Sequence, residues 1–98
     1  MYSRKSNNYS LKEVIQQFKR AYGIERKLDE AELMNSWDGI VGKTIVKHTK
    51  SMRIKNGVMF VNIDSPVIRN ELMMSRTKLV DALNGTVGKS IIKDIVFR

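Results

Sequence analysis

The sequence contains no cysteine and a single histidine among its 98 residues, and both shortages exclude classes of site. Without cysteine there is no disulfide, no thiolate metal site and no thiol nucleophile. The lone His48 rules out a multi-histidine metal site, and we expect no metal or other cofactor. No apolar run is long enough to cross a membrane, and the polar first residues do not resemble a signal peptide. We therefore expect a small cytoplasmic protein with no membrane partner.

The charges that are present are strongly unbalanced, with 18 Lys and Arg against 10 Asp and Glu and a net charge of +8. Acidic residues without any Lys or Arg occupy residues 29 to 42. Basic residues without any Asp or Glu occupy residues 43 to 55, where they are Lys43, Lys47, Lys50, Arg53 and Lys55. This clustering indicates a polyanionic partner. A solvated, lysine-rich surface is the alternative, because net charge concerns association and not fold.

The first 22 residues of the chain consist of a polar start and one helical pattern. Residues 1 to 9 show no apolar period and predict a flexible basic arm before a single domain at residues 10 to 98. The spacing of Ser10 and Glu13 is that of a capping box and starts a helix over residues 10 to 22. One side of this helix is cationic, and the other is an apolar stripe that we expect to face the core, made of Leu11, Val14, Ile15, Phe18 and Tyr22.

A second helix is expected from Asp29 to about His48, with a break near Gly42. Trp37 is the only tryptophan and lies on the apolar side of this helix, so it is predicted to anchor the core and not to stack on a base. The acidic residues near the start of the helix complement its positive end. Contact with a basic partner is the other interpretation of these carboxylates.

The clearest local signal is Asn56-Gly57 between two runs rich in β-formers, which predicts a type I′ hairpin. The strands are residues 51 to 55 and 58 to 64. A two-residue turn places Arg53 opposite Phe60 and gives one core face. The other face combines cationic and apolar side chains, which favours a binding surface, and it carries Arg53, Lys55, Val58 and Phe60.

A third helix is expected from the Ser65-Pro66 cap to Asn84-Gly85, followed by a last strand within residues 91 to 98. The predicted fold is α+β, helix-helix-strand-strand-helix-strand, with helices packed on one face of a three-stranded sheet. The last strand is expected to run parallel to a hairpin strand. The segment Gly85 to Gly88 with Lys89 is similar to the backbone-clamping loop of KH domains, although a helix cap plus a turn glycine is the favoured interpretation.

Several short motifs resemble the DciA-like family over residues 10 to 98: WDGIVG at 37–42, KHT at 47–49, NGVMFVNI at 56–63, EL at 71–72, LN at 83–84 and IVFR at 95–98. The family is similar to KH-fold modules. The resemblance implies an operator of the bacterial replicative helicase, which binds a DnaB-type helicase and DNA and promotes helicase loading. Many members carry a long disordered extension, whereas this sequence stops at Arg98, so helicase contact is expected through the domain or the arm.

Residues and resemblance together predict a nucleoid-associated, DNA-binding module, with single-stranded or forked DNA preferred and little sequence choice. A KH-like RNA-binding accessory of the ribosome or of RNA metabolism is the alternative. Edge strands and exposed apolar residues would permit a homodimer. The residues expected to contact nucleic acid are Lys12, Lys19, Arg20, Lys43, Lys47, Lys50, Arg53, Lys55, Phe60 and Lys89.

No enzymatic activity is expected. His48 has no nucleophile or acid in a recognisable motif beside it, and Asp64 and Glu71 do not form a recognisable carboxylate pair. We expect His48 to end a helix or to contact a phosphate.

Overall fold

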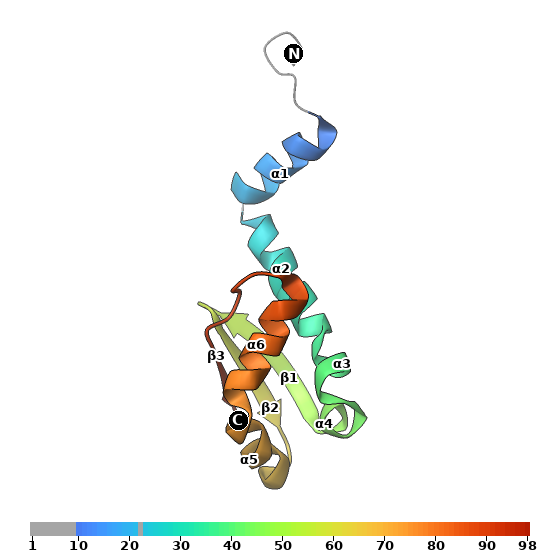
Figure 1. The fold of residues 1–98 in the computed structure, drawn as a ribbon, viewed down its shortest axis with the longest axis vertical. Coiled ribbons are helices and arrows are strands. Elements are labelled where there is room, and N and C mark those ends of the chain that lie inside the picture. The colour runs from blue at the N-terminus through green and yellow to red at the C-terminus, as the bar shows by residue number, and fades with distance from the viewer. Residues whose placement is uncertain (1–9, 22) are drawn as a thin grey trace.

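The computed structural model describes the backbone of residues 10–21 and 23–98 and the side chains of residues 10–18 and 23–98. The arm predicted at residues 1 to 9 lies outside the described residues. The elements in chain order (Figure 1) are α1 (Leu11–Ala21), α2 (Ile24–Asn35), α3 (Trp37–Val41), α4 (Lys43–Lys47), β1 (Thr49–Lys55), β2 (Val58–Ile63), α5 (Pro66–Met74), α6 (Arg76–Val87) and β3 (Asp94–Phe97).

The three strands form one sheet in the order β1-β2-β3. Asn56 and Gly57 join β1 to β2 with φ angles of 52° and 76°, as a type I′ turn requires, and Arg53 pairs with Phe60. The strand β3 runs parallel to β2. This orientation is the one expected for a last strand that follows the third helix. The predicted hairpin, its register and the α+β class are therefore confirmed.

The core lies between the sheet and the helices that cover one of its faces (Figure 1). Trp37 is fully buried at its centre, where its indole Nε1 donates a hydrogen bond to Thr49 Oγ1 at 3.2 Å and its ring centroid lies 6.4 Å from that of Phe97. The prediction of Trp37 as a core anchor is confirmed. The buried side chains are Leu33, Trp37, Met59, Val61, Ile63, Leu72, Leu79, Leu83, Ile92, Ile95 and Phe97.

The start of the second predicted helix is wrong. The helix α2 begins at Ile24, after Gly23 in the left-handed conformation (φ 70°). Asp29 lies inside the helix, and its Oδ2 accepts a hydrogen bond from Lys89 Nζ at 2.9 Å. A capping signature is worth only about 1 kcal/mol, so the backbone hydrogen bonds of a longer helix outweigh it. The predicted break at Gly42 is confirmed, since its φ of 86° separates α3 from α4.

The third predicted helix is divided and ends later than expected. The division is at Ser75, whose N–H bonds back to the carbonyl of Leu72 and tightens the last turn of α5. Asn84 does not stop the helix, and its Oδ1 instead accepts hydrogen bonds from the N–H groups of Ile91 and Ile92 at 3.0 Å. The helix α6 runs on to Gly88 at φ 77°. The similarity of Gly85 to Gly88 to a clamping loop is therefore not borne out, because Gly85 lies within the helix.

The helix α1 starts as predicted but does not join the core. Ser10 Oγ accepts from the Glu13 N–H, and Glu13 Oε1 accepts from the Ser10 N–H, both at 3.2 Å. The helix extends beyond the end of the sheet (Figure 1), and within the described residues α2 is the only element with which it packs extensively. Its apolar stripe is exposed, at 76% for Leu11, 43% for Val14, 44% for Ile15 and 54% for Phe18. The predicted core position is wrong, since periodicity identifies an apolar face but not its cover.

Across residues 10–21 and 23–98, no helix combines the length and the apolarity that crossing a bilayer requires.

Candidate nucleic-acid interface

The outer face of the sheet, defined here as the face away from the helices, is centred on Phe60 of β2. The guanidinium carbon of Arg53, on β1, lies 4.5 Å from the centroid of the Phe60 ring. The guanidinium carbon of Arg98, just after β3, lies 5.0 Å from the same centroid. Attraction between each cation and the ring holds the three side chains together. A half-buried aromatic ring thus lies beside an arginine from each neighbouring strand.

Alternation along the hairpin explains this arrangement. Arg53 and Lys55 are two residues apart on β1 and share a face, and the antiparallel register sets them opposite Phe60 and Val58. Both basic side chains are exposed. The predicted sharing of one face by these four residues is confirmed.

Arg98 is a member of the outer face that the list of expected residues missed. Its neighbour Val96 pairs with Phe60, and its N–H donates to the carbonyl of Val61 at 2.9 Å. The alternation of residues 94, 96 and 98 placed Arg98 on the polar side of the last strand. The missing information was the strand order, which sets β3 directly beside β2.

Lys43 and Lys47 lie at the two ends of the short helix α4, and both are exposed. They border an open depression together with Asp38, Gly39 and Val46. The extended ψ of 170° at Gly42 turns the chain between α3 and α4 and sets Lys43 beside the end of α3.

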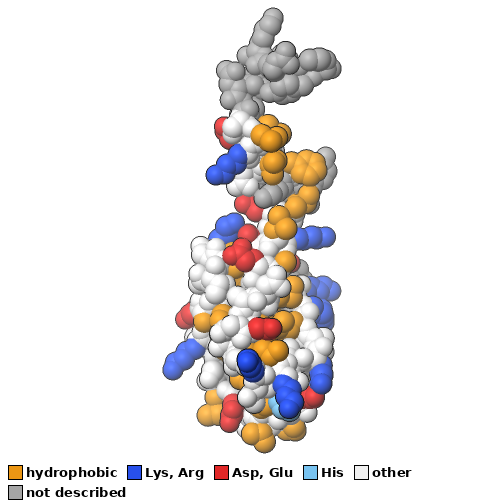
Figure 2. All heavy atoms as spheres, turned by 90° about the vertical axis from the view of Figure 1, so that its right-hand side faces the viewer, with side chains coloured by type: hydrophobic (Ala, Val, Ile, Leu, Met, Phe, Trp, Pro, Cys, Tyr) orange, Lys and Arg blue, Asp and Glu red, His pale blue; other side chains and the backbone are white. Residues whose placement is uncertain are grey.

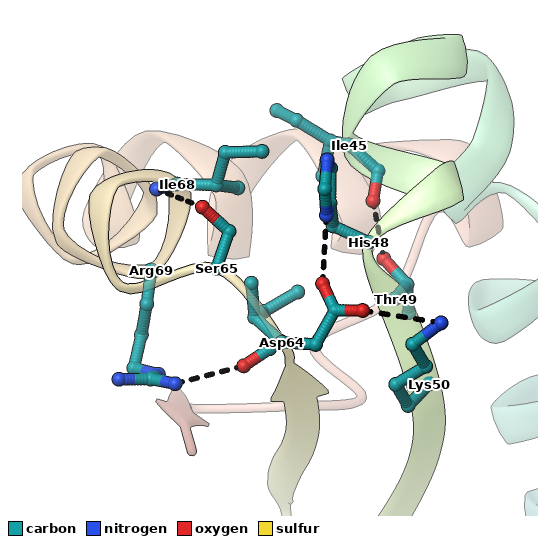
Figure 3. A network of polar contacts seen from close by, with 9 residues as sticks. Ile45, His48, Thr49, Lys50, Asp64, Ser65, Ile68 and Arg69 are labelled. Atoms are coloured by element: carbon teal, nitrogen blue, oxygen red, sulfur yellow. Dashed lines mark hydrogen bonds and ion pairs between the residues drawn. The ribbon is translucent and has the colours of Figure 1, made fainter.

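Lys50 and the last turn of α4 are tied to the end of β2 by Asp64 (Figure 3). His48 Nδ1 and Asp64 Oδ1 are 2.7 Å apart, and Lys50 Nζ lies 3.1 Å from Asp64 Oδ2. The hydrogen bond with His48, and next the one from Lys50, lower the pKa of the Asp64 carboxyl below its ordinary value of 3.8. His48 directly follows α4, as predicted for a helix-terminal residue. Lys50 is therefore partly neutralised by Asp64.

The lysines of α4 adjoin the first residues of β1. A second shallow depression, lined in part by Lys50 and Ser51, shares Asp38 and Val46 with the one that Lys43 and Lys47 border. The structure thus forms two basic groups. The sheet-face group consists of Arg53 and Arg98 beside Phe60, with Lys55 on the same face. The edge group consists of Lys43, Lys47 and Lys50. Figure 2, which faces the right-hand side of Figure 1, shows Lys and Arg side chains across the lower domain with acidic ones among them.

Four of the expected residues lie elsewhere. Lys12 is on α1, beyond the end of the sheet. The backbone of Lys19 and Arg20 is also on α1, and the side chains of these two residues lie outside the described part of the chain. Lys89 Nζ lies 2.9 Å from Asp29 Oδ2 and 3.5 Å from Glu25 Oε1, so it joins the end of α6 to α2. The hydrogen bond to Asp29 is the main cause that raises the pKa of Lys89 above its ordinary value of 10.5.

In the described part of the chain, Arg53, Lys55, Arg98, Lys43 and Lys47 form no ion pair with a carboxylate. Over the same residues, His, Asp and Glu side chains form no group of three or more that could hold a metal ion. The site is thus a set of available cations beside an aromatic ring, a combination suited to phosphates and unpaired bases.

Comparison with known proteins supports one family. The family model described as "Dna[CI] antecedent, DciA" matches residues 10–97. A UPF0232 protein of Rhodococcus jostii (strain RHA1) is 22% identical over 73 residues, which are 74% of this chain and 39% of that protein. The chain therefore spans well under half the length of this curated relative. The match to the family model covers nearly the whole sequence and confirms the predicted resemblance, so the chain belongs to the DciA family.

Proposed function

We propose that this chain is a non-enzymatic accessory of DNA replication, which binds DNA and a DnaB-type replicative helicase and assists loading of the helicase. Membership of the DciA family supports the replication role. The matched residues cover 39% of the Rhodococcus jostii protein, so the activity of a whole DciA protein is part of the proposal for this chain.

The observation that carries DNA binding is the outer face, where Phe60 lies beside Arg53 and Arg98. Guanidinium groups bind phosphate oxygens in a bidentate manner. Both the ring and the planar guanidinium groups offer surfaces on which an unpaired base stacks, worth about 1 to 3 kcal/mol for each base. Contacts of these kinds carry little sequence information, so binding is sequence-tolerant and favours single-stranded or forked DNA.

The edge group extends the same function. Lys43 and Lys47 form no ion pair within the described residues, and they adjoin β1 through the two depressions that share Asp38 and Val46. If each of Lys43, Lys47, Arg53, Lys55 and Arg98 meets one phosphate, log K against log salt falls with a slope of about −3.5 on single strands.

The test is a salt titration of binding to a fluorescent oligothymidylate. The double substitution Arg53→Gln with Arg98→Gln is expected to weaken binding about tenfold or more and to make the slope shallower by about 1.4, since two phosphate contacts are lost. The control is Lys27→Gln with Lys78→Gln, which removes the same charge from exposed residues of α2 and α6. The control is expected to keep the wild-type slope, because these helices lie on the other side of the sheet.

Two results would contradict the DNA-binding half of the proposal. The first is a wild-type affinity that does not depend on salt. The second is equal loss in both double variants, which would assign binding to net charge and not to the outer face. An RNA of the same sequence measured in parallel decides the nucleic acid, since tighter binding of RNA would favour the RNA-accessory alternative.

A further inference from the structure

The outer face of the sheet carries a polar group that the function proposed above does not use. Asn62 lies two residues after Phe60 on β2, so the two side chains point to the same face. The Asn62 side chain is exposed, and its Nδ2 donates a hydrogen bond to Ser51 Oγ on β1. Asparagine is uncommon in β-strands, which favour β-branched and aromatic residues. Its place beside the aromatic ring therefore needs an explanation.

Both neighbours of Asn62 in the sheet are polar residues. Ser51 pairs with it in the antiparallel ladder. On the other side, the Arg98 N–H donates to the carbonyl of Val61 at 2.9 Å, and the Arg98 carbonyl accepts from the Ile63 N–H at 2.7 Å. These two bonds lie on either side of Asn62, so Arg98 is its neighbour in the parallel ladder. Asn62 thus lies in a row of three polar residues, next to the row that holds Phe60.

The contact with Ser51 holds the Asn62 amide and leaves hydrogen-bonding groups available. An asparagine amide has two N–H donors and one carbonyl acceptor. One donor is used by Ser51 Oγ, and within the part of the chain that the structure describes no protein donor reaches Asn62 Oδ1. The exposed amide therefore offers one acceptor and one donor side by side. This pair is complementary to adenine, whose amino group donates and whose neighbouring ring nitrogen accepts.

We propose that Asn62 contacts the edge of one unpaired base, with adenine preferred, while a neighbouring base stacks on Phe60. The inference rests on the proposed DNA binding and adds a preference at one nucleotide to a surface that is otherwise sequence-tolerant. The spacing is compatible with it. Two residues of a strand span about 6.6 Å, at about 3.3 Å per residue. This is about twice the 3.4 Å between stacked bases, so an unstacked strand can place successive bases on the two rows.

The test compares two DNA strands of about 12 nucleotides that differ only at the base edge. One is oligodeoxyadenylate, and the other carries unsubstituted purine at every position, which lacks only the 6-amino group. The ring system that stacks is the same in both, but the donor for Asn62 Oδ1 is lost. By fluorescence anisotropy the wild type is expected to bind the adenine strand about fivefold or more tightly than the purine strand.

Three variants assign this preference to the amide. Asn62→Ala is expected to bind both strands with the same affinity, close to that of the wild type for the purine strand. Ser51→Ala is expected to reduce the preference in part, because the amide loses the contact that holds it. The control Asn70→Ala removes an exposed amide from α5 and is expected to keep the full preference. Fluorescence of the buried Trp37 verifies that each variant folds.

The outcomes separate this inference from the proposed function. A wild type that binds the adenine and purine strands equally would overturn the base contact and leave DNA binding in place. A preference that persists in Asn62→Ala would assign it to another residue and would also overturn the inference. Equal loss of affinity for both strands in Asn62→Ala would place Asn62 at the sugar-phosphate backbone. Failure of the wild type to bind either strand would contradict the proposed function itself, and this inference with it.

Discussion

At the residue scale, Asp64 connects three segments that are distant in the sequence. Its carboxylate accepts hydrogen bonds from His48 and Lys50 (Figure 3). Its N–H donates to the carbonyl of His48 at 3.1 Å. The next residue, Ser65, caps α5 by accepting a hydrogen bond from the Ile68 N–H at 3.3 Å. Asp64 thus holds the end of β2 against the end of α4 and the start of β1, and it positions the Lys50 side chain.

The lowered pKa of Asp64 predicts a dependence of stability on pH. Because the folded-state pKa lies below the unfolded value of about 3.8, the carboxylate stabilises the fold above that pH. This contribution is lost as the pH falls through the folded-state pKa. Asp64→Asn is therefore expected to lower the melting temperature at pH 7, and the difference from wild type should shrink toward zero in the most acidic samples.

The measurement is thermal unfolding followed by Trp37 fluorescence at several pH values between 7 and 2. Asp81→Asn is a matched control, since Asp81 is exposed on α6 and forms no ion pair in the described part of the chain. A destabilisation by Asp64→Asn that is the same at every pH would show that the carboxylate charge has no role.

At the scale of the element, the end of α6 shows two glycines with different roles. Gly85 lies inside the helix, whereas Gly88 ends it in the left-handed conformation at φ 77°. An added Cβ would meet no atom within 4 Å at either position, so packing does not distinguish them. The difference comes from backbone conformation alone.

Substitution of each glycine by alanine is therefore expected to change stability in opposite directions. Gly85→Ala should raise the free energy of unfolding by about 0.5 to 1 kcal/mol, because alanine has the higher helix propensity. Gly88→Ala should lower it by about 1 to 2 kcal/mol, because a side chain in the left-handed region is strained. Urea unfolding followed by Trp37 fluorescence measures both. Equal losses at the two positions would indicate that residues 85 to 88 form a loop, as in KH domains.

At the scale of the whole molecule, three surfaces are separated in space. The helices α2, α5 and α6 cover one face of the sheet, the outer face is open, and α1 extends beyond the end of the sheet (Figure 1). The arginines beside Phe60 are on the outer face, and the exposed apolar stripe is on α1. Such a molecule has room for nucleic acid and protein partners at the same time.

This separation predicts that helicase binding survives loss of DNA binding. The chain with Arg53→Gln and Arg98→Gln is expected to co-purify with the replicative helicase of its own cell as well as the wild type does. The measurement is affinity capture from nuclease-treated lysate, with the helicase identified by mass spectrometry. Joint loss of both partners would place them on the same surface, and the absence of helicase from the wild-type sample would refute the helicase half of the proposed function.

Much of the fold could be predicted from the sequence because its signals are local. Asn56-Gly57 fixes both the turn and the register, and through them the pairing of Arg53 with Phe60. The caps at Ser10 and Ser65 depend on atoms three residues away and are also confirmed. The start at Asp29 is wrong because a cap signature also occurs inside a longer helix, where it competes with backbone hydrogen bonds.

The candidate site was predictable only in part. The cations of the hairpin follow from alternation, but the place of Arg98 beside Phe60 depends on which strand β3 joins. The local sequence gives no ion-pair partner for Lys89. Only the packing of α6 on α2 brings it to Asp29 and Glu25. Whether such charges meet depends on distances between segments far apart in the chain, and the spacing of neighbouring residues does not give these distances.

The sequence by itself determined the class of fold, the hairpin, the family and the excess of positive charge, because these depend on composition and on neighbours a few residues apart. The tertiary structure alone decided which cations remain unpaired in the described chain, that Arg98 joins Phe60, and that α1 exposes its apolar stripe. The physical reason is that burial and ion pairing arise between segments far apart in the chain. A periodic pattern states that a face is apolar, and only three-dimensional packing states what, if anything, covers it.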